Sequence, residues 1–225
     1  MPITVIIPAL NEAGNIGDLV CETLAQPVDR VIVVDNGSTD ATADLAQQAG
    51  AMVISEPRRG YGYACAAGAA AVASQDILLF LDGDYSSLPA EMMTVVAPLQ
   101  AEQADLVLGS RSLGNIVKGA MPAHQQFGNW LVSRSMGILY GLQVTDLGPY
   151  RAIRNSLLQQ LRMQEMTFGW PTEMMVKAAK GGARIVEVPV SYHPRRSGRS
   201  KVSGTVRGSI LAAYYILSVT VRYAR

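Results

Sequence analysis

The chain has 225 residues, of which 49% are hydrophobic, and a formal net charge of +1 at pH 7, so it can form one large apolar core. The near-neutral charge, with aromatic residues that do not alternate with the basic ones, argues against a nucleic-acid-binding protein. Two cysteines in apolar stretches argue against a disulfide framework or a Cys-based metal site, and the absence of a basic leader argues against a signal peptide, so we expect a cytoplasmic protein.

Short β-branched runs alternate with helical stretches in the first half of the chain. Strands are predicted over 3–8, 30–35, 51–55, 76–82 and 105–109, and helices over 14–25, 40–49, 62–74 and 90–102. Continuous apolar strands separated by helices are typical of a parallel sheet covered on both faces. We therefore predict a doubly wound α/β fold whose ligand site lies beyond the carboxyl ends of the strands.

The pattern changes after residue 110. Helices are predicted over 124–140 and 172–181, and a strand over 184–190. The mixed polar and apolar residues of 122–141 fit a helix lying against lipid and, equally, a core helix with a polar entrance. We expect one domain over 1–203 and a separate helix over 204–225. The uncharged run 208–221 is shorter than the roughly 20 residues that cross a bilayer, so this helix should lie in the membrane interface or pack on another subunit.

Two aspartates follow the fourth predicted strand. Asp82 and Asp84 are residues i and i+2 of an extended segment, so their side chains can point to the same side. A divalent cation would remove their repulsion, and Mg²⁺ commonly binds one or two carboxylates together with diphosphate oxygens. Taken alone, an Asp-Gly-Asp sequence is more commonly a surface turn. We favour a metal site because three other loops at the same sheet edge also suit a nucleotide.

These three loops carry the other candidates of the first half. They contain Pro8, Asn11 and Glu12 after the first strand, Asp35 and Asn36 after the second, and Arg58 and Arg59 beside glycines after the third. Asn11 and Glu12 also suit a helix N-terminus, and Asp-Asn-Gly is an ordinary turn sequence. A Rossmann dinucleotide site and a P-loop are disfavoured because neither glycine motif is present.

The C-terminal region should bind anions. No acidic residue follows Glu187, whereas seven Arg and Lys residues do. The glycine and serines of the basic stretch 193–201 suit a loop that closes over phosphates, although a solvated loop has a similar composition. Phosphates of a small ligand or of a membrane surface are therefore the expected partners.

The ordered motifs VIIPALNE, VVDNGSTD, ILLFLDGD, DLVLGSR, TDLGPYRAI and IVEVPVSYHPRRSGRSK resemble family 2 glycosyltransferases of the GT-A fold. Within that family they look most like the dolichyl- or polyprenyl-phosphate sugar synthases, over residues 3 to about 207. The resemblance implies a Rossmann-like sandwich with a mostly parallel sheet. It also implies a UDP- or GDP-hexose donor, Mg²⁺ or Mn²⁺ at the D-x-D, and inverting transfer of glucose or mannose to a polyprenyl phosphate at the inner face of the cell membrane.

The resemblance also implies roles for individual residues. Residues 1–110 correspond to the donor half and 111–203 to the acceptor half. The donor-binding positions, with Arg59 and Asn36 added from the loops, are Pro8, Asn11, Glu12, Asp35, Asn36, Arg59, Asp82 and Lys201, and the metal ligands are Asp82 and Asp84. The acceptor positions, with the cations Lys118 and Arg134 added, are Arg111, Lys118, Arg134, Arg151 and Ser200. Asn36 departs from the family pattern, which has a second Asp there.

Cleavage of a sugar–diphosphate bond needs positive charge on the leaving group, which a metal at Asp84 and the Arg195 side chain can supply. A phosphate acceptor is already anionic and needs no base, whereas a hydroxyl acceptor needs a carboxylate. Glu173 is the candidate base, although a first-turn helical glutamate can also be catalytically silent. The alternatives are a transferase that acts on a hydroxyl, a non-catalytic nucleotide-sugar-binding protein and a nucleotidyltransferase. The last is disfavoured because the first loop has no basic residue.

Overall fold

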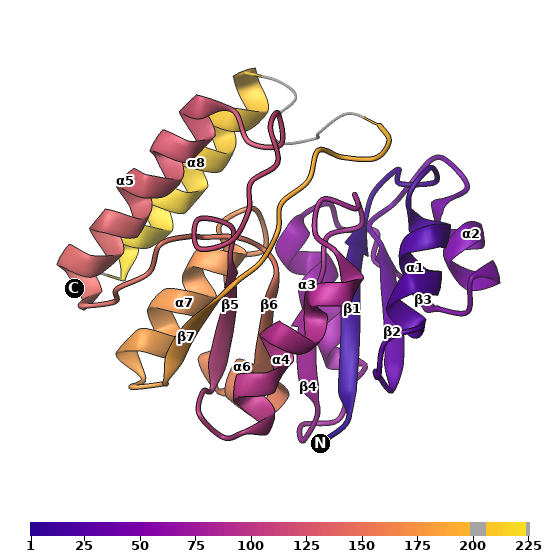
Figure 1. Cartoon of the computed structure of the whole chain (residues 1–225), viewed down its shortest axis with the longest axis horizontal. Helices are drawn as coiled ribbons and strands as arrows, with labels where there is room; N and C mark the ends of the chain where they lie inside the picture. Colours follow the sequence, from indigo (N-terminus) through magenta and orange to yellow (C-terminus); the bar gives the residue numbers. More distant parts are fainter. Residues whose placement is uncertain (199–205, 224–225) are drawn as a thin grey trace.

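A seven-stranded sheet in the order β3-β2-β1-β4-β6-β5-β7 forms the centre of the computed structural model (Figure 1). Its strands are β1 (Ile3–Ala9), β2 (Arg30–Asp35), β3 (Met52–Ser55), β4 (Ile77–Phe80), β5 (Leu106–Ser110), β6 (Arg151–Arg154) and β7 (Ile185–Pro189). Neighbouring strands are parallel, except that β6 runs antiparallel to both β4 and β5. The structure describes residues 1–198 and 206–223, with the backbone only for 206–213.

Helices cover both faces of the sheet. They are α1 (Ile16–Leu24), α2 (Thr42–Gln48), α3 (Tyr61–Ala70), the short 3₁₀ helix η1 (Pro89–Glu91), α4 (Met92–Gln100), α5 (Ala123–Tyr140), α6 (Asn155–Leu161), α7 (Trp170–Lys180) and α8 (Val206–Arg222). Because successive strand residues point to opposite faces, Val5 and Ile7 pack in one apolar cluster with α1 and α4. Ile6 packs in the other, with α3, α6 and α7. This arrangement explains why β1 is apolar on both faces.

The predicted strands and helices all form, with ends shifted by a few residues. Two elements were not predicted, β6 and α6. β6 has only four residues, with an arginine at each end, so its sequence lacks the apolar run of the other strands. Because this antiparallel strand lies between β4 and β5, the sheet is mostly rather than entirely parallel. The boundary expected at residue 203 lies outside the described residues.

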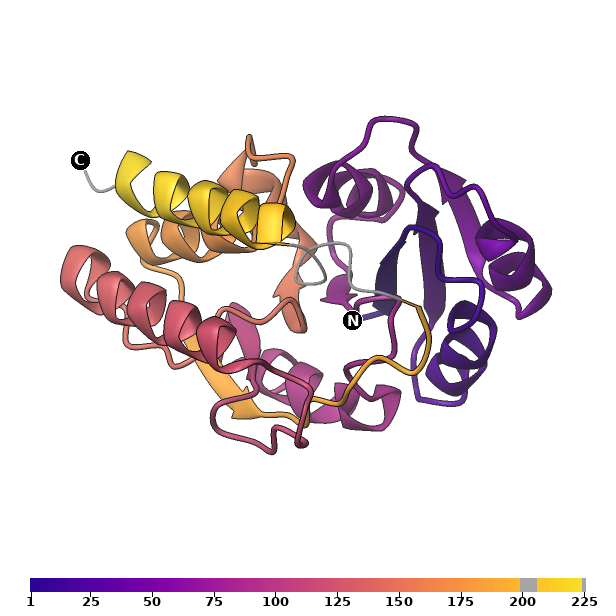
Figure 2. The same ribbon diagram turned by 90° about the horizontal axis from the view of Figure 1, so that it is seen from above.

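Helices α5 and α8 lie beside each other at the end of the molecule farthest from β3 (Figures 1 and 2). The Tyr140 hydroxyl of α5 donates a hydrogen bond to the carbonyl of Thr220 in α8. Helix α7 also contacts α8 and lies between it and the sheet. Within the described residues, no helix is both long enough and apolar enough to cross a bilayer.

The strand ends determine where the loops meet. Ala9 of β1 pairs with Asp35 of β2, which pairs with Ser55 of β3. β4 runs parallel to β1, and β5 runs in the same direction because both are antiparallel to β6. The loops after β1, β2, β3, β4 and β5 therefore emerge at one edge of the sheet, as predicted for an α/β ligand site.

Candidate active site

A cleft of about 810 Å³ opens at this edge of the sheet. The strand-end loops and the segment after β7 contribute polar lining residues, namely Glu12, Asn36, Arg59, Tyr61, Asp82, Asp84, Arg111 and Arg195. The region of α5 and α8 contributes mostly apolar ones, among them Met121, Leu131, Val132, Ile216 and Leu217. The cleft therefore joins a charged region to an apolar one.

Asp82 and Asp84 line the cleft just beyond β4, which ends at Phe80. Asp82 Oδ1 is buried without a hydrogen-bond partner. Burial, followed by the charge of Asp84, raises the pKa of Asp82 to about 7. Asp84 is held in a turn, because its Oδ1 accepts hydrogen bonds from Ser86 N at 3.0 Å and Ser86 Oγ at 2.6 Å. Tyr85 between them has a left-handed backbone, with φ 63°.

The guanidinium group of Arg195 joins Asp84 to Glu12. Its Nη1 donates to Asp84 Oδ2 at 2.9 Å, and its Nη2 donates to Glu12 Oε1. The residues before and after it attach the segment 190–198 to the first half of the chain, since His193 N donates to Ser86 O at 2.9 Å and Arg196 lies 3.7 Å from the centre of the Tyr85 ring. Figure 2 shows this gold segment reaching from β7 across to the side of β1. One cation thus neutralises two carboxylates that come from different loops.

Asn36 holds the loop 56–60 at the cleft. Its Nδ2 donates to Glu56 O at 2.9 Å and to Arg58 O at 2.7 Å, and its Oδ1 accepts from Gly60 N at 2.9 Å. An aspartate has no amide to donate to those carbonyls, which is a physical reason for asparagine at this position. The same loop brings Arg59 to the cleft.

Two predicted donor-binding residues support the loops from outside the cleft lining. Asp35 accepts a hydrogen bond from Ser38 N at 3.0 Å. Asn11 Oδ1 accepts from Thr39 N at 2.7 Å, and Asn11 N donates to Ser38 Oγ at 2.9 Å. Pro8, in contrast, lines the cleft. Asp35 and Asn11 therefore shape the first two loops rather than forming the wall of the cleft.

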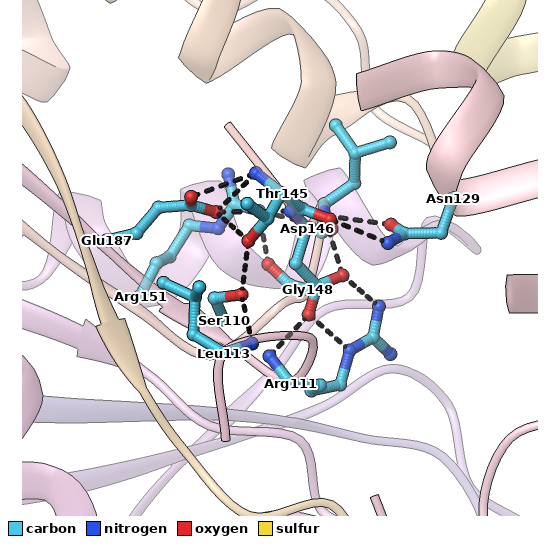
Figure 3. A network of polar contacts seen from close by, with 10 residues as sticks. Ser110, Arg111, Leu113, Asn129, Thr145, Asp146, Gly148, Arg151 and Glu187 are labelled. Carbon is cyan, nitrogen blue, oxygen red and sulfur yellow. Dashed lines mark hydrogen bonds and ion pairs between the residues drawn. The ribbon is translucent and has the colours of Figure 1, made fainter. Parts of the chain in front are cut away.

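Arg111 lines the cleft and is held by Asp146, a residue for which the sequence predicted no role (Figure 3). Arg111 N and Nε each donate to Asp146 Oδ2 at 2.7 Å, and Nη2 donates to Oδ1 at 2.6 Å. Burial opposes the charge on Asp146, but the hydrogen bonds from Arg111 outweigh it and lower the pKa of Asp146 overall. The Arg111 guanidinium also lies 4.8 Å from the centre of the Tyr192 ring.

The loop that carries Asp146 is itself held by two side chains from other elements (Figure 3). Glu187 of β7 accepts from Thr145 N at 2.9 Å and from Asp146 N at 3.1 Å. Asn129 of α5 accepts from Leu147 N at 3.0 Å and donates to Thr145 O at 3.1 Å. The position of Arg111 thus depends on contacts between β5, β7 and α5.

The donor set fits a hard divalent cation that is shared with a ligand. Asp82 offers a buried carboxylate oxygen without a partner, and Asp84 lies beside it. Oxygen donors of this kind suit Mg²⁺ or Mn²⁺. Within the described ranges, no group of three or more His, Cys, Asp and Glu side chains could hold a metal by itself. The two aspartates would therefore hold a metal together with oxygens of a bound diphosphate.

Residues 4–179 match the family described as Glycosyl transferase family 2. The chain is a family 2 glycosyltransferase. An uncharacterized glycosyltransferase of Mycobacterium tuberculosis is 40% identical to it over 211 residues, which cover 93% of this chain and 94% of that protein. The undecaprenyl-phosphate mannosyltransferase of Micrococcus luteus is 31% identical over 222 residues, which cover 92% and 90%. The enzyme class expected from the motifs is therefore confirmed.

The crystal structure of glucosyl-3-phosphoglycerate synthase from Mycobacterium tuberculosis, in complex with Mn²⁺, UDP and phosphoglyceric acid, has the same fold. It matches this transferase with a TM-score of 0.80 and 24% sequence identity, covering 99% of this chain and 78% of that chain. The likeness confirms the predicted GT-A fold, a Rossmann-like sandwich with a mostly parallel central sheet.

Three residues expected at the acceptor lie outside the cleft lining of the transferase. Arg151 is fully buried, and its Nη1 donates to Pro171 O at 2.7 Å while its Nη2 donates to Gly148 O. Burial lowers the pKa of Arg151 to about 10. Lys118 and Arg134 are exposed on the surface. Contact with an acceptor inside the cleft does not fit these positions, because Arg151 supports backbone carbonyls and the other two face solvent.

Glu173 is likewise not part of the cleft lining. Its Oε2 accepts from Gln164 N at 2.9 Å and from Glu165 N at 2.7 Å. Its Oε1 accepts from the Tyr223 hydroxyl at 2.6 Å and pairs with Lys177 at 2.8 Å. Both oxygens are engaged in joining α7 to a loop and to the end of α8, so this geometry does not fit the role of base that was expected of Glu173 with a hydroxyl acceptor.

We expect Glu173→Gln to destabilise the transferase and to spare its chemistry. An amide leaves Lys177 without its charged partner, which should lower the unfolding free energy by roughly 1–3 kcal/mol and the thermal midpoint by several degrees. Turnover should stay within about twofold. Thermal unfolding and kcat are the measurements, with the exposed Glu102→Gln as control. A loss of more than about 100-fold in kcat at an unchanged midpoint would restore Glu173 as the base.

Sequence reasoning missed the residues that position the site. These are Asn129, Asp146 and Glu187. Glu187 had one visible signal, since it is the charged residue inside an otherwise apolar strand. Ser200 and Lys201, predicted to bind the acceptor and the donor, lie outside the described residues.

Proposed function

We infer that the enzyme is an inverting, metal-dependent hexosyltransferase that moves a sugar from a UDP- or GDP-hexose to a polyprenyl phosphate. In this proposal, residues 1–110 hold the donor and residues 111–203 hold the acceptor. The substrate named for the Micrococcus luteus relative, undecaprenyl phosphate, is of this acceptor class. The Mn²⁺ and UDP in the structurally similar synthase support a divalent cation and a nucleotide donor.

The continuity of the cleft is the observation that carries the proposal. Asp82, Asp84 and Arg195 lie in the same cleft as Leu131 of α5 and Leu217 of α8. Both leucines are also exposed at the surface, by 42% and 41%. An acceptor with a charged head and a long apolar tail suits such a cleft, because the tail can leave along apolar side chains.

In this proposal, the chain supplies positive charge both to the diphosphate of the donor and to the phosphate of the acceptor. When bound, the cation would neutralise charge on the departing diphosphate. Arg195, which lies beside Asp84, would donate hydrogen bonds to the same leaving group, and Arg59 borders the same cleft. Arg111, locked by Asp146, has guanidinium hydrogens that are not used by that carboxylate and suit the acceptor phosphate.

A phosphate acceptor also fits the acidic residues that are present. Among the described residues that line the cleft, the carboxylates are Glu12, Asp82 and Asp84. Glu12 pairs with Arg195, and Asp82 and Asp84 are assigned to the metal. A hydroxyl acceptor would need a further carboxylate as base, whereas an anionic phosphate oxygen needs none. Phosphoglyceric acid, bound by the similar synthase, is a second anionic compound to be tested as acceptor.

A labelled-donor panel tests the proposal. The enzyme is incubated with Mn²⁺ and radiolabelled UDP-glucose, GDP-mannose or related donors, with a short polyprenyl phosphate, 3-phosphoglycerate or a prenyl alcohol. We expect label in the organic phase only with the polyprenyl phosphate, and no transfer after chelation of Mn²⁺. Label on 3-phosphoglycerate or on the alcohol, and none on the polyprenyl phosphate, would contradict the proposal.

A further inference from the structure

The outer faces of α5 and α8 expose an unusual amount of apolar surface. Eight of the twelve large apolar side chains that are exposed in the described part of the chain belong to these two helices. The most exposed are Phe127, Trp130 and Ile138 on α5 and Tyr214 and Val221 on α8, at 58–76%. Exposed apolar side chains gathered in one region usually mark an interaction site. We name this region the α5–α8 face.

The residues of α5 divide between two sides of the helix. Phe127, Trp130 and Ile138 are spaced by three and eight residues, which places them on one side of a helix. Val132 and Met136 are buried on the other side. The rings of Phe127 and Trp130 lie together, with centroids 5.8 Å apart. The buried side of α5 packs in the core, so the exposed side is available to a partner.

The charged residues in the two stretches of sequence that form this face all have one sign. No acidic residue lies between Asp105 and Asp146, and none follows Glu187. Lys118, Arg134 and Arg222 are exposed in these same stretches. Apolar and aromatic residues accompanied by cations, without carboxylates, match the composition of surfaces that bind anionic lipid.

We propose that the α5–α8 face docks the enzyme on the surface of an anionic lipid bilayer. A second copy of the chain is a less suitable occupant, because Leu131 and Leu217 belong both to this face and to the cleft, so a protein seated there would cover the apolar side of the cleft. A bilayer in the same position would present the tail of a lipid acceptor to it. The purpose of this docking rests on the proposed lipid acceptor, but binding to lipid does not require that acceptor.

The experiment uses vesicles that contain no polyprenyl phosphate. Vesicles of phosphatidylcholine and phosphatidylglycerol in equal parts are sedimented with the full chain. The bound fraction should fall severalfold at high salt or with phosphatidylcholine alone. The double variant Phe127→Ser/Trp130→Ser should bind at least about tenfold more weakly. The exposed apolar residues Leu24 and Met52, on other elements, provide the matched control Leu24→Ser/Met52→Ser, which should bind like the wild type.

Tryptophan fluorescence gives a second measurement of lipid binding, made on the wild type and on one conservative variant. The enzyme has two tryptophans, Trp130 at 58% exposure and Trp170 at 1%. Lipids brominated on their acyl chains should quench the wild-type emission, and Trp130→Phe should remove that quenching. Three results would each overturn the docking proposal. They are no quenching of the wild-type emission, vesicle binding by the double variant at the wild-type level, and a dimer in sedimentation that the double variant disrupts.

The outcomes separate docking from function. Transfer to a detergent-dispersed short polyprenyl phosphate should be retained by the double variant, because neither substituted residue is part of the cleft lining. Transfer without vesicle binding would refute docking and leave the proposed function intact. Vesicle binding without transfer to any polyprenyl phosphate would refute the function and leave docking intact.

Discussion

Replacing Asp82 with asparagine should reduce glycosyl transfer at least about 100-fold and should also stabilise the metal-free enzyme. The loss is expected because the variant removes a charged metal ligand. The gain in stability is expected because burial and the charge of Asp84 raise the pKa of Asp82 to about 7, and because one Asp82 oxygen is buried without a hydrogen-bond partner. A neutral side chain removes this unfavourable charge, so the unfolding free energy should rise by roughly 2–4 kcal/mol at pH 8.

The sign of the pH dependence follows from the direction of the shift. The pKa of Asp82 is higher in the folded enzyme than the ordinary value of 3.8, so its ionisation favours the unfolded chain. The wild type should lose stability relative to Asp82→Asn as pH rises from about 4 to about 7, and the difference should then level off. Denaturant titrations in the presence of a chelator, at several pH values, measure this difference.

Two further variants test whether the loss of activity and the gain in stability are specific to Asp82. Asp84→Asn should lose activity too, but without the gain in stability, because Asp84 accepts hydrogen bonds from Ser86 and Arg195. Asp44→Asn, at an exposed position of α2, should change neither property. If Asp82→Asn kept full activity, or lost stability at pH 8 without metal, the role assigned to the aspartate pair would be wrong.

Replacing Arg195 with alanine should have opposite effects on metal binding and on catalysis. In the metal-free enzyme, the Arg195 guanidinium neutralises Asp84 and Glu12, so it competes with any cation that approaches Asp84. Without it, Mn²⁺ alone should bind severalfold more tightly. Catalysis should fall about 100- to 1,000-fold, because a hydrogen-bond donor to the leaving diphosphate is lost.

Arg196 provides the matched control for this prediction. It is the next residue in the same segment, but it pairs with Asp18 at an exposed site and stacks on Tyr85. Arg196→Ala should therefore leave Mn²⁺ binding unchanged and reduce kcat by less than about threefold. Free Mn²⁺ measured by electron paramagnetic resonance, with and without UDP, gives the affinity. Weaker Mn²⁺ binding by Arg195→Ala in the absence of UDP would contradict competition.

The alternation of apolar strands and helices determined the architecture of the first half from sequence alone. A strand with apolar residues on both faces must be covered on both sides, and its loops must then emerge at the ends of the sheet. The positions of Asp82 and Asp84 followed from the same logic, since they come directly after β4. Such patterns depend only on residues that are close together in the sequence.

Tertiary structure alone decided which charged side chains reach the cleft. Arg195 meets Asp84 and Glu12 across 111 and 183 residues of chain, and Arg111 is held by a carboxylate 35 residues away. Glu173 looked like an accessible first-turn carboxylate, yet packing directs it toward Lys177 and Tyr223. A side chain's direction and charge depend on the partners that the fold brings to it, and those partners are not its neighbours in sequence.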